Sequence, residues 1–369
     1  MKIVVIGANG FLGKNLVQHL LYKEAYEVFE ITRETSETEV MGYLKEADFI
    51  FHLAGVNRPE DENEFIKGNR DLIEEIVEKL EQIKNYPPIL LTSSVQAELD
   101  NPYGKSKRAG EAIVLNYSKK FHTPCFIYRL PNVFGKWAQP NYNSVVATFS
   151  YKIAREEDIQ IQDADKEVAF VYIDDVIKEF LRVLDGRVAR NLDFYTIPIV
   201  YEVKIGELAE LLQLFNEARK KQIVPDMSDS FIKKLYSTYL SYLPSTAFRS
   251  VLTTHEDPRG SFTEFVKSPA GGQVSVNVSK PGVTKGEHWH HTKNEKFLVV
   301  RGAGKIKLRH IFKEEVLEYQ VSDKKLEIID IPVGYTHSIV NTGSEEMVTI
   351  MWVNEMFDPQ NPDTYALEV

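Results

Sequence analysis

Three histidines lie within four positions near residue 290, and a glutamate follows them closely. His288, His290 and His291 flank Trp289, and Glu295 comes five residues after His290. Alternate side chains of a strand share one face, so His288 and His290 should point together, and Glu295 should join them from the returning strand. Because imidazole and carboxylate groups are metal ligands, this spacing predicts a metal site. The alternative is a histidine-rich strand that holds no metal.

A tyrosine and a lysine predict a second, different chemistry. The chain has 18 tyrosines, and only Tyr103 is followed four positions later by a lysine, Lys107. On a helix this spacing places both on one face, where an ammonium lowers the pKa of a phenol from about 10 and makes it a usable general acid. Ser94 follows an apolar run, and we expect it to hydrogen-bond the carbonyl that Tyr103 protonates. The alternative is a helix-capping serine near a surface pair.

A glycine-rich turn near the N-terminus predicts a dinucleotide site. Gly7, Gly10 and Gly13 separate a strand-like run from a helical run. Glycines at this spacing permit a sharp turn and let the backbone approach a pyrophosphate, which then meets unpaired amides at a helix N-terminus. The motif alone also fits a plain strand-to-helix turn. It lies, however, in the first such turn of an alternating domain, which is the context that the motif requires.

The residue after the second predicted strand indicates which nicotinamide cofactor binds. Thr32-Arg33 stands where an acidic residue would accept hydrogen bonds from a ribose 2'-hydroxyl. A guanidinium pairs with a 2'-phosphate, so Arg33 favours NADPH over NADH. The alternative is an exposed arginine on a solvated loop.

Length, charge and cysteine content narrow the class of protein. A chain of 369 residues exceeds one ordinary core, which predicts two domains. The net charge of -10 argues against a nucleic-acid or membrane-surface partner and favours a small soluble substrate. A single cysteine, Cys125, no signal-peptide pattern at the start and no run of about 18 apolar residues together predict a reducing, cytoplasmic location.

The order of apolar patterns predicts an α/β domain followed by an all-β domain. Up to about Phe180, strand-like runs alternate with helical runs, which predicts a Rossmann-type, doubly wound parallel sheet. The pattern then reads as helical from Lys204 to Tyr242. After Thr253 short strands predominate. We therefore expect domains at 1–245 and 251–369. The predicted strands are Ile3–Ile6, Tyr26–Thr32, Phe49–Ala54, Ile89–Ser93, Cys125–Leu130, Phe262–Val266, Val274–Val278, Lys296–Val300, Lys305–Ile311, Glu327–Ile331 and Met347–Trp352.

The first half resembles the extended short-chain dehydrogenases that act on nucleotide sugars. The resemblance runs from Met1 to about Asp185 and rests on the glycine turn, His52–Gly55, Thr92–Ser94, Tyr103 with Lys107, Arg129–Gly135 and Phe170–Val176. It implies that Ser94 and Tyr103 contact the reacting oxygen and that Lys107 holds the nicotinamide ribose. It also implies cofactor contacts from Gly7, Asn9, Gly10, Phe11, Leu12, Gly13, Arg33, Leu53, Ala54 and Lys107. The segment between Ser94 and Tyr103 is shorter than usual in that family. His52 either lines the cofactor pocket or is a buried histidine bonded by backbone.

The second half resembles the cupin barrels. The spacing of Gly282, His288, His290, Glu295 and Gly302 matches their first signature, and Pro332–His337 with Asn341 matches most of the second, although Leu326 replaces its first glycine. The resemblance implies the ligand set His288, His290, Glu295 and His337. Three imidazoles and a carboxylate suit zinc, manganese, iron or nickel, of which we favour zinc. His291 should face away. A shorter segment, Asp257–Phe265, resembles the opening strand of deoxysugar-nucleotide keto-epimerases, or is only a turn into an edge strand.

The whole chain resembles the bifunctional capsular polysaccharide enzymes of the CapF type, which make UDP-N-acetyl-L-fucosamine precursors. This implies that the cupin domain epimerises a UDP-2-acetamido-2,6-dideoxy-4-ketohexose at C3. The first domain would then reduce C4 with NADPH to a UDP-2-acetamido-2,6-dideoxy-L-talose. One alternative is a non-catalytic NADPH-binding sensor with a sugar-binding cupin module, and another is a cupin dioxygenase fused to a reductase. Because both folds often pair, we expect a homodimer.

Overall fold

The computed structural model describes residues 1–59, 61–188 and 193–369. By internal contacts the chain divides into two compact units, Met1–Gln213 with Lys234–Pro244, and Leu214–Lys233 with Ser245–Val369. The segment 214–233 groups with the second unit because two backbone hydrogen bonds join it to Lys267. The N–H of Lys267 donates to the Gln222 carbonyl at 2.9 Å, and the N–H of Val224 donates to the Lys267 carbonyl at 2.8 Å. No helix in the described part of the chain is long and apolar enough to cross a membrane.

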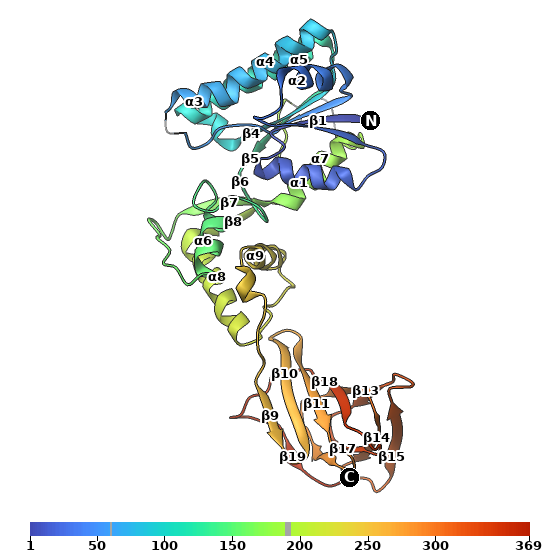
Figure 1. Ribbon diagram of the computed structural model, residues 1–369. Helices are drawn as coiled ribbons and strands as arrows, with labels where there is room; N and C mark the ends of the chain where they lie inside the picture. Colours follow the sequence, from blue (N-terminus) through green and yellow to red (C-terminus); the bar gives the residue numbers. More distant parts are fainter. Residues whose placement is uncertain (60, 189–192) are drawn as a thin grey trace. The chain divides into compact units, whose positions relative to one another are not determined.

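The first unit is built on a parallel sheet with the strand order β2-β1-β3-β4-β5 (Figure 1). All four strand pairs are parallel, and the order reverses at β1, because β2 lies on one side of it and β3 on the other. The elements are β1 (Lys2–Ile6), α1 (Phe11–Leu21), β2 (Glu27–Ile31), α2 (Glu37–Glu46), β3 (Phe49–His52), α3 (Asn63–Ile66), the π-helix η1 (Lys67–Asp71), α4 (Leu72–Ile83), β4 (Ile89–Ser94), the 3-10 helix η2 (Val95–Glu98), α5 (Pro102–Phe121) and β5 (Cys125–Leu130).

Helices cover both faces of this sheet, and each face has its own hydrophobic core. Residues of α1 and α7 pack on one face, as Leu16 and Phe180 illustrate. Residues of α2, α4 and α5 pack on the other, as Leu44, Leu80 and Val114 illustrate. Strands buried on both faces need continuous apolar runs, which is what β1, β3 and β4 have. The predicted Rossmann-type doubly wound sheet is confirmed.

A second, smaller sheet has the order β6-β7-β8. Its surrounding elements are β6 (Asn132–Phe134), α6 (Val145–Ile153), β7 (Glu167–Tyr172), α7 (Ile173–Leu184), β8 (Tyr201–Lys204), α8 (Ile205–Lys220) and α9 (Ser230–Ser241). The helical pattern expected from Lys204 to Tyr242 is wrong over residues 221–229. Gln222 has a φ of 55°, and Asp229 accepts the backbone N–H groups of Phe231 and Ile232 at 2.7 and 2.9 Å, which starts a new helix.

The second unit contains two antiparallel sheets, with the orders β16-β13-β18-β11-β10-β9 and β15-β14-β17-β12-β19. The all-β, cupin-like fold predicted for this half is confirmed. The elements are the 3-10 helix η3 (Ser245–Ala247), β9 (Thr254–Asp257), β10 (Gly260–Ser268), β11 (Gly272–Ser279), β12 (Thr284–Trp289), β13 (Glu295–Arg301), β14 (Ala303–His310), β15 (Val316–Ser322), β16 (Ile328–Ile331), β17 (Tyr335–Asn341), β18 (Met347–Val353) and β19 (Tyr365–Ala366).

The burial of β11 runs against its pattern. The strand alternates valines with polar residues, and the polar ones are buried while the valines are partly exposed. The ladders explain this arrangement, because Gln273 lies in one row with Val353 and Glu295, and Asn277 lies in one row with Thr349 and Val299. Paired residues share a face, so the polar side of β11 lies on the same face as Glu295.

Candidate active site and metal centre

The glycine turn lies at the point where the strand order of the parallel sheet reverses. Gly7 follows β1 with a φ of 85°, and a Cβ there would lie 2.7 Å from the backbone nitrogen of Ala54, which follows β3. A Cβ at Gly13 would lie 2.1 Å from the Gly7 carbonyl oxygen. Gly10 caps α1 without a side-chain hydrogen bond, which leaves the first amides of the helix open to an anion. Only glycine fits at positions 7 and 13, and the turn has the form of a pyrophosphate site.

Ser94, Tyr103 and Lys107 converge at the carboxyl edge of the same sheet. Ser94 ends β4, and Tyr103 and Lys107 lie one helical turn apart at the start of α5. Asn101 caps this helix by accepting the N–H of Gly104 at 2.7 Å, and Pro102 occupies its first position, so Tyr103 and Lys107 both lie within its first two turns. Lys107 Nζ donates to the Thr92 carbonyl at 3.1 Å.

The pKa values of Tyr103 and Lys107 are set by burial more than by the contact between the two side chains. Burial raises the pKa of Tyr103, and a hydrogen bond with Ser94 acts in the opposite direction. Burial lowers the pKa of Lys107 to about 8, although Glu111 acts to raise it. The lowering of the Tyr103 pKa by Lys107 that the spacing predicts is therefore not observed, since desolvation of the phenolate outweighs it and Lys107 Nζ lies 6.0 Å from the ring centroid. Tyr103 is a protonated phenol at neutral pH, which suits a proton donor.

Glu111 holds the backbone behind this site, and sequence reasoning missed it. Its carboxylate is 3 % exposed, accepts Ser93 Oγ at 2.5 Å, and is bound by Arg129 through Nε at 2.9 Å and Nη2 at 2.7 Å. These contacts join the end of β4 to α5 and β5. The signal in the sequence was a glutamate four positions after Lys107, on the same helical face.

Asn69 is a second residue that the sequence reasoning missed. It lies in η1, is 4 % exposed, and donates through Nδ2 to the Val56 carbonyl at 2.8 Å and to Ser106 Oγ at 3.0 Å. Its Oδ1 accepts the N–H of Val56 at 3.0 Å. The loop after β3 is thereby tied to α5, where a Cβ at Gly55 would lie 3.0 Å from Lys107 Nζ. Short π-helices such as η1 often lie at functional positions, but their local sequence gives little sign of them.

Two further predicted cofactor residues differ in their surroundings. Arg33 is exposed just after β2, as a contact to a cofactor phosphate requires. His52 at the end of β3 is fully buried, and neither ring nitrogen has a hydrogen-bond partner among the described residues. Both roles expected for His52, in the cofactor pocket or as a buried histidine bonded by backbone, stay predictions. Burial, followed by the charge of Lys107, lowers the pKa of His52 to about 3, so the ring is neutral.

The structure brings the four predicted metal ligands together. His288 lies on β12, His290 just after its end, Glu295 at the start of β13 and His337 on β17, directly across from His288. One nitrogen or oxygen of each residue lies within 4.8 Å of those of the other three. His291 faces away and is exposed, where its ring packs against Trp289 and Tyr365.

The donor atoms of this cluster fit a divalent cation. His290 Nε2 and Glu295 Oε2 are buried and lack a hydrogen bond of acceptable geometry among the described residues, although His337 Nε2 lies 3.0 Å from Glu295 Oε2. Burial acts to raise the pKa of Glu295, but His290 and His337 lower it to about 2. Burial, with the two neighbouring imidazoles, lowers the pKa of His288 to about 4. An ionised carboxylate and a neutral imidazole are the forms that bind metals.

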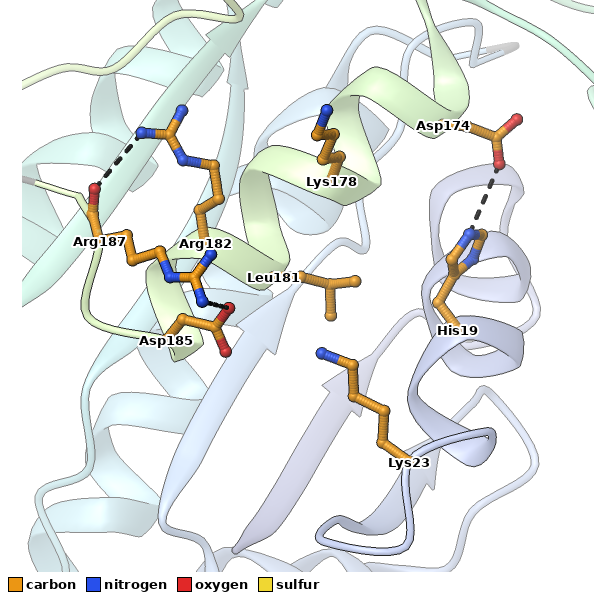
Figure 2. A pocket seen from close by; sticks show the side chains of 8 residues that line it. All are labelled: His19, Lys23, Asp174, Lys178, Leu181, Arg182, Asp185 and Arg187. Carbon is orange, nitrogen blue, oxygen red and sulfur yellow. Dashed lines mark hydrogen bonds and ion pairs between the residues drawn. The ribbon is translucent and has the colours of Figure 1, made fainter.

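A hollow of about 590 Å³ on the surface of α1 and α7 lies apart from both constellations (Figure 2). Some of its polar side chains lie close to each other, for example His19 to Asp174 at 3.7 Å and Arg187 to Asp185 at 3.7 Å. It contains none of the predicted site residues. The predicted catalytic residues of the first unit lie at the sheet edge and not in this hollow.

Comparison with known proteins agrees with both halves of the chain. Residues 3–195 match the NAD dependent epimerase/dehydratase family. Residues 255–365 match the polysaccharide biosynthesis C-terminal domain. The chain is 45% identical over 369 residues to a UDP-2-acetamido-2,6-beta-L-arabino-hexul-4-ose reductase of Pseudomonas aeruginosa, covering 100% of this chain and 99% of that one.

Solved structures show the same relationship over the whole chain. The capsular polysaccharide assembling protein CapF from Staphylococcus aureus matches with a TM-score of 0.93 and 53% identity, with both chains covered in full. A UDP-glucuronic acid 4-epimerase from Bacillus cereus in complex with NAD is 20% identical with a TM-score of 0.57 over 66% of this chain, and shows the fold alone. The chain therefore belongs to the NAD-dependent epimerase/dehydratase family, as a two-domain capsular polysaccharide protein of the CapF type.

Proposed function

We propose that the protein is a bifunctional nucleotide-sugar enzyme that acts on a UDP-2-acetamido-2,6-dideoxy-4-ketohexose. The C-terminal unit epimerises C3, and the N-terminal unit reduces the C4 ketone with NADPH to a UDP-2-acetamido-2,6-dideoxy-L-talose. The observation that carries the proposal is the convergence of Ser94, Tyr103 and Lys107 beside the glycine turn. The reductase from Pseudomonas aeruginosa, 45% identical over the full length, supports the substrate class.

In the reduction, the residues of the first unit position a ketone and deliver its proton. NADPH supplies the hydride when it is bound. Ser94 Oγ orients the C4 oxygen, and the Tyr103 hydroxyl gives that oxygen a proton as the hydride reaches the carbon, so the ketone becomes an alcohol. Lys107, held by the Thr92 carbonyl at 3.1 Å, supplies a positive charge beside the nicotinamide ribose and the phenolate that forms. Arg33, exposed after β2, would pair with the 2'-phosphate that distinguishes NADPH from NADH.

In the epimerisation, a divalent cation would be held by His288, His290, Glu295 and His337. A cation in this position would polarise the keto oxygen as a Lewis acid and make the C3 proton more acidic. Zinc is our choice among the metals that suit three imidazoles and a carboxylate. The polar face of β11, with Gln273 in the ladder row of Glu295, adds hydrogen-bonding groups to the same face of the sheet. The homodimer and the cytoplasmic location stay predictions.

An exchange experiment in heavy water tests this assignment. The protein is incubated with a UDP-4-keto-6-deoxy aminosugar, with and without NADPH, and incorporated deuterium is located by NMR. We expect deuterium at C3 without NADPH, and consumption of NADPH with formation of a C4 alcohol when it is added. No deuterium at C3 would remove the epimerase activity, and no NADPH oxidation would favour the sensor alternative. Oxygen uptake would favour the dioxygenase alternative.

A further inference from the structure

The last described segment of the chain, residues 362–369, lies along the strand that carries the first metal-binding histidine. β19 pairs antiparallel with β12, so that Ala366 lies opposite His288 and Tyr365 lies opposite Trp289. The pairing continues beyond β19, where the N–H of Leu367 donates to the Glu287 carbonyl at 3.0 Å. This segment therefore forms part of the wall of the metal centre, although none of its residues belongs to the four-residue ligand cluster.

The backbone carbonyl of Asp363 determines which nitrogen of His290 faces the cluster. His290 Nδ1 lies 2.5 Å from this oxygen. A carbonyl oxygen can only accept a hydrogen bond, so Nδ1 must carry the hydrogen and the lone pair of the neutral ring must lie on Nε2. Nε2 is the buried atom without a hydrogen-bond partner among the described residues, and it lies 3.6 Å from Glu295 Oε2. For comparison, His337 Nδ1 is buried without such a partner within the described ranges.

The carboxylate of Asp363 fixes the turn that joins His290 to Glu295. Its two oxygens accept the backbone N–H groups of His291, Thr292 and Lys293 at 3.0, 2.9 and 3.0 Å. The hydroxyl of Thr292 adds a fourth hydrogen bond at 2.9 Å. A carboxylate that accepts several backbone N–H groups holds a loop firmly, because these hydrogen bonds are charge-assisted.

The backbone of Asp363 is itself in an uncommon conformation. Its φ is 42°, in the left-handed region that non-glycine residues adopt when surrounding contacts hold them there. This conformation lets one residue present its carbonyl to His290 and its carboxylate to the turn that follows. One residue thus contacts both the ring of His290 and the turn that follows it.

We propose that Asp363 is a positioning residue of the metal centre, which fixes the tautomer of His290 and the turn between His290 and Glu295. The proposal rests on the metal site proposed above. Asp363 does not bind the metal itself, since its carboxylate is engaged by the turn. Residues that orient metal-binding histidines typically change metal affinity by about 10- to 100-fold when replaced.

The test measures the affinity of the metal-free full-length protein for Zn²⁺ alone, by competition with a chelating indicator. The variants are D363N, which tolerates the left-handed backbone and keeps one acceptor oxygen, and D363G, which tolerates it and keeps none. We expect affinity losses of about 10- to 100-fold for D363G and smaller losses for D363N. D358A is the matched control, because Asp358 lies in the preceding loop and its carboxylate accepts hydrogen bonds from its neighbours Gln360 at 2.9 Å and Asn361 at 3.1 Å.

Thermal unfolding of the metal-free proteins separates positioning from general stability. The proposal requires that the metal-free D363N and wild-type proteins unfold at similar temperatures while their Zn²⁺ affinities differ. Equal Zn²⁺ affinities for D363G and wild type overturn it, and so does a loss of affinity matched by an equal loss of stability without metal. If wild type itself fails to bind Zn²⁺, the metal site falls as well, which is a distinct result. Nitrogen-15 NMR of the His290 ring adds a check on the tautomer. Both variants keep the backbone carbonyl of residue 363, so we expect the single Nδ1–H tautomer to be lost in D363G, where the carboxylate no longer holds this carbonyl in place, and an unchanged tautomer in D363G would remove this part of the proposal.

Discussion

At the scale of single residues, the reduction proposed for the first unit depends on a half-buried lysine as much as on a tyrosine. Tyr103 is protonated far above neutral pH because burial raises its pKa. Lys107 is the group that titrates near the working range, because burial lowers its pKa to about 8. The pH dependence of the reduction should therefore report on Lys107.

We predict that kcat/KM for ketone reduction is highest below pH 8 and falls above it. The ammonium of Lys107 is present below its pKa and is lost as the pH rises through about 8, so the rate should drop about tenfold per further pH unit. K107R should remove this descending limb, because a guanidinium stays charged, although its different shape should lower the maximum rate. K105A is the control, because Lys105 is exposed and pairs with Asp100, and its pH profile should match that of wild type. A wild-type profile that stays flat to pH 10 would contradict the assignment.

Spacing in the sequence predicted that the candidate site residues come together, but not their electrostatics. Tyr103, Lys107 and the four metal-binding candidates stand at intervals set by helix and strand geometry, and the structure brings each group together. The raised pKa of Tyr103 depends on how deeply α5 is buried. Asp363 was also beyond prediction, since more than 60 residues separate it from the histidine that it contacts.

At the scale of elements, the end of β4 is held by an ion pair that is largely removed from solvent. Glu111 on α5 binds Arg129 on β5, and their side chains are 3 % and 16 % exposed. Breaking such a pair leaves one buried charge without its partner.

We predict that E111Q destabilises the protein by about 3 kcal/mol, because Arg129 then keeps its charge without a buried carboxylate. The matched control is E81Q, which breaks the exposed pair between Glu81 on α4 and Lys120 on α5, 2.8 Å apart, and should cost less than about 1 kcal/mol. Urea unfolding of both variants measures the difference. Equal losses of unfolding free energy in E111Q and E81Q would show that burial of the Glu111–Arg129 pair does not add to its stabilising effect.

Several strands of the second unit could not be predicted because their patterns lack a clear apolar period. β9 is exposed throughout and β15 is exposed over its first five residues, so neither forms a typical half-buried strand. β11 was predicted as a strand. Its alternating valines would be expected in the core, whereas its polar residues are the buried ones. The ladder with β18 decides this, and cross-strand register is not visible in a single segment.

At the scale of the whole molecule, two constellations of different chemistry lie in two compact units of one chain. Both would suit a sugar that carries a ketone, because in the proposed function the tyrosine would protonate a carbonyl oxygen and a metal ion held by the histidine cluster would polarise one. If each unit performs its own step, single substitutions should separate the steps.

We predict that Y103F and H337A have reciprocal effects. Y103F removes the proton donor, so NADPH oxidation should fall by about 10²- to 10⁴-fold while deuterium exchange at C3 and NADPH binding persist. H337A removes a candidate ligand, so the metal content in elemental analysis and the exchange at C3 should fall while NADPH binding persists. Absorbance, NMR and metal analysis of the same preparations provide the measurements. Loss of C3 exchange in Y103F, or an unchanged metal content in H337A, would refute the respective assignment.

The π-helix η1 affects whether this chain can lose one residue. Removing one residue between Lys67 and Asp71 would let α3 run into α4 as a single regular helix, with its backbone hydrogen bonds intact. The residues before the deletion, including α3, would then rotate by about 100° about the helix axis relative to α4. The amide of Asn69 would swing away from Val56 and Ser106 and release the loop that lies against Lys107. Helix geometry alone would accept the shorter chain, whereas the hydrogen bonds of Asn69 and the packing of Phe65 on Tyr103 oppose it.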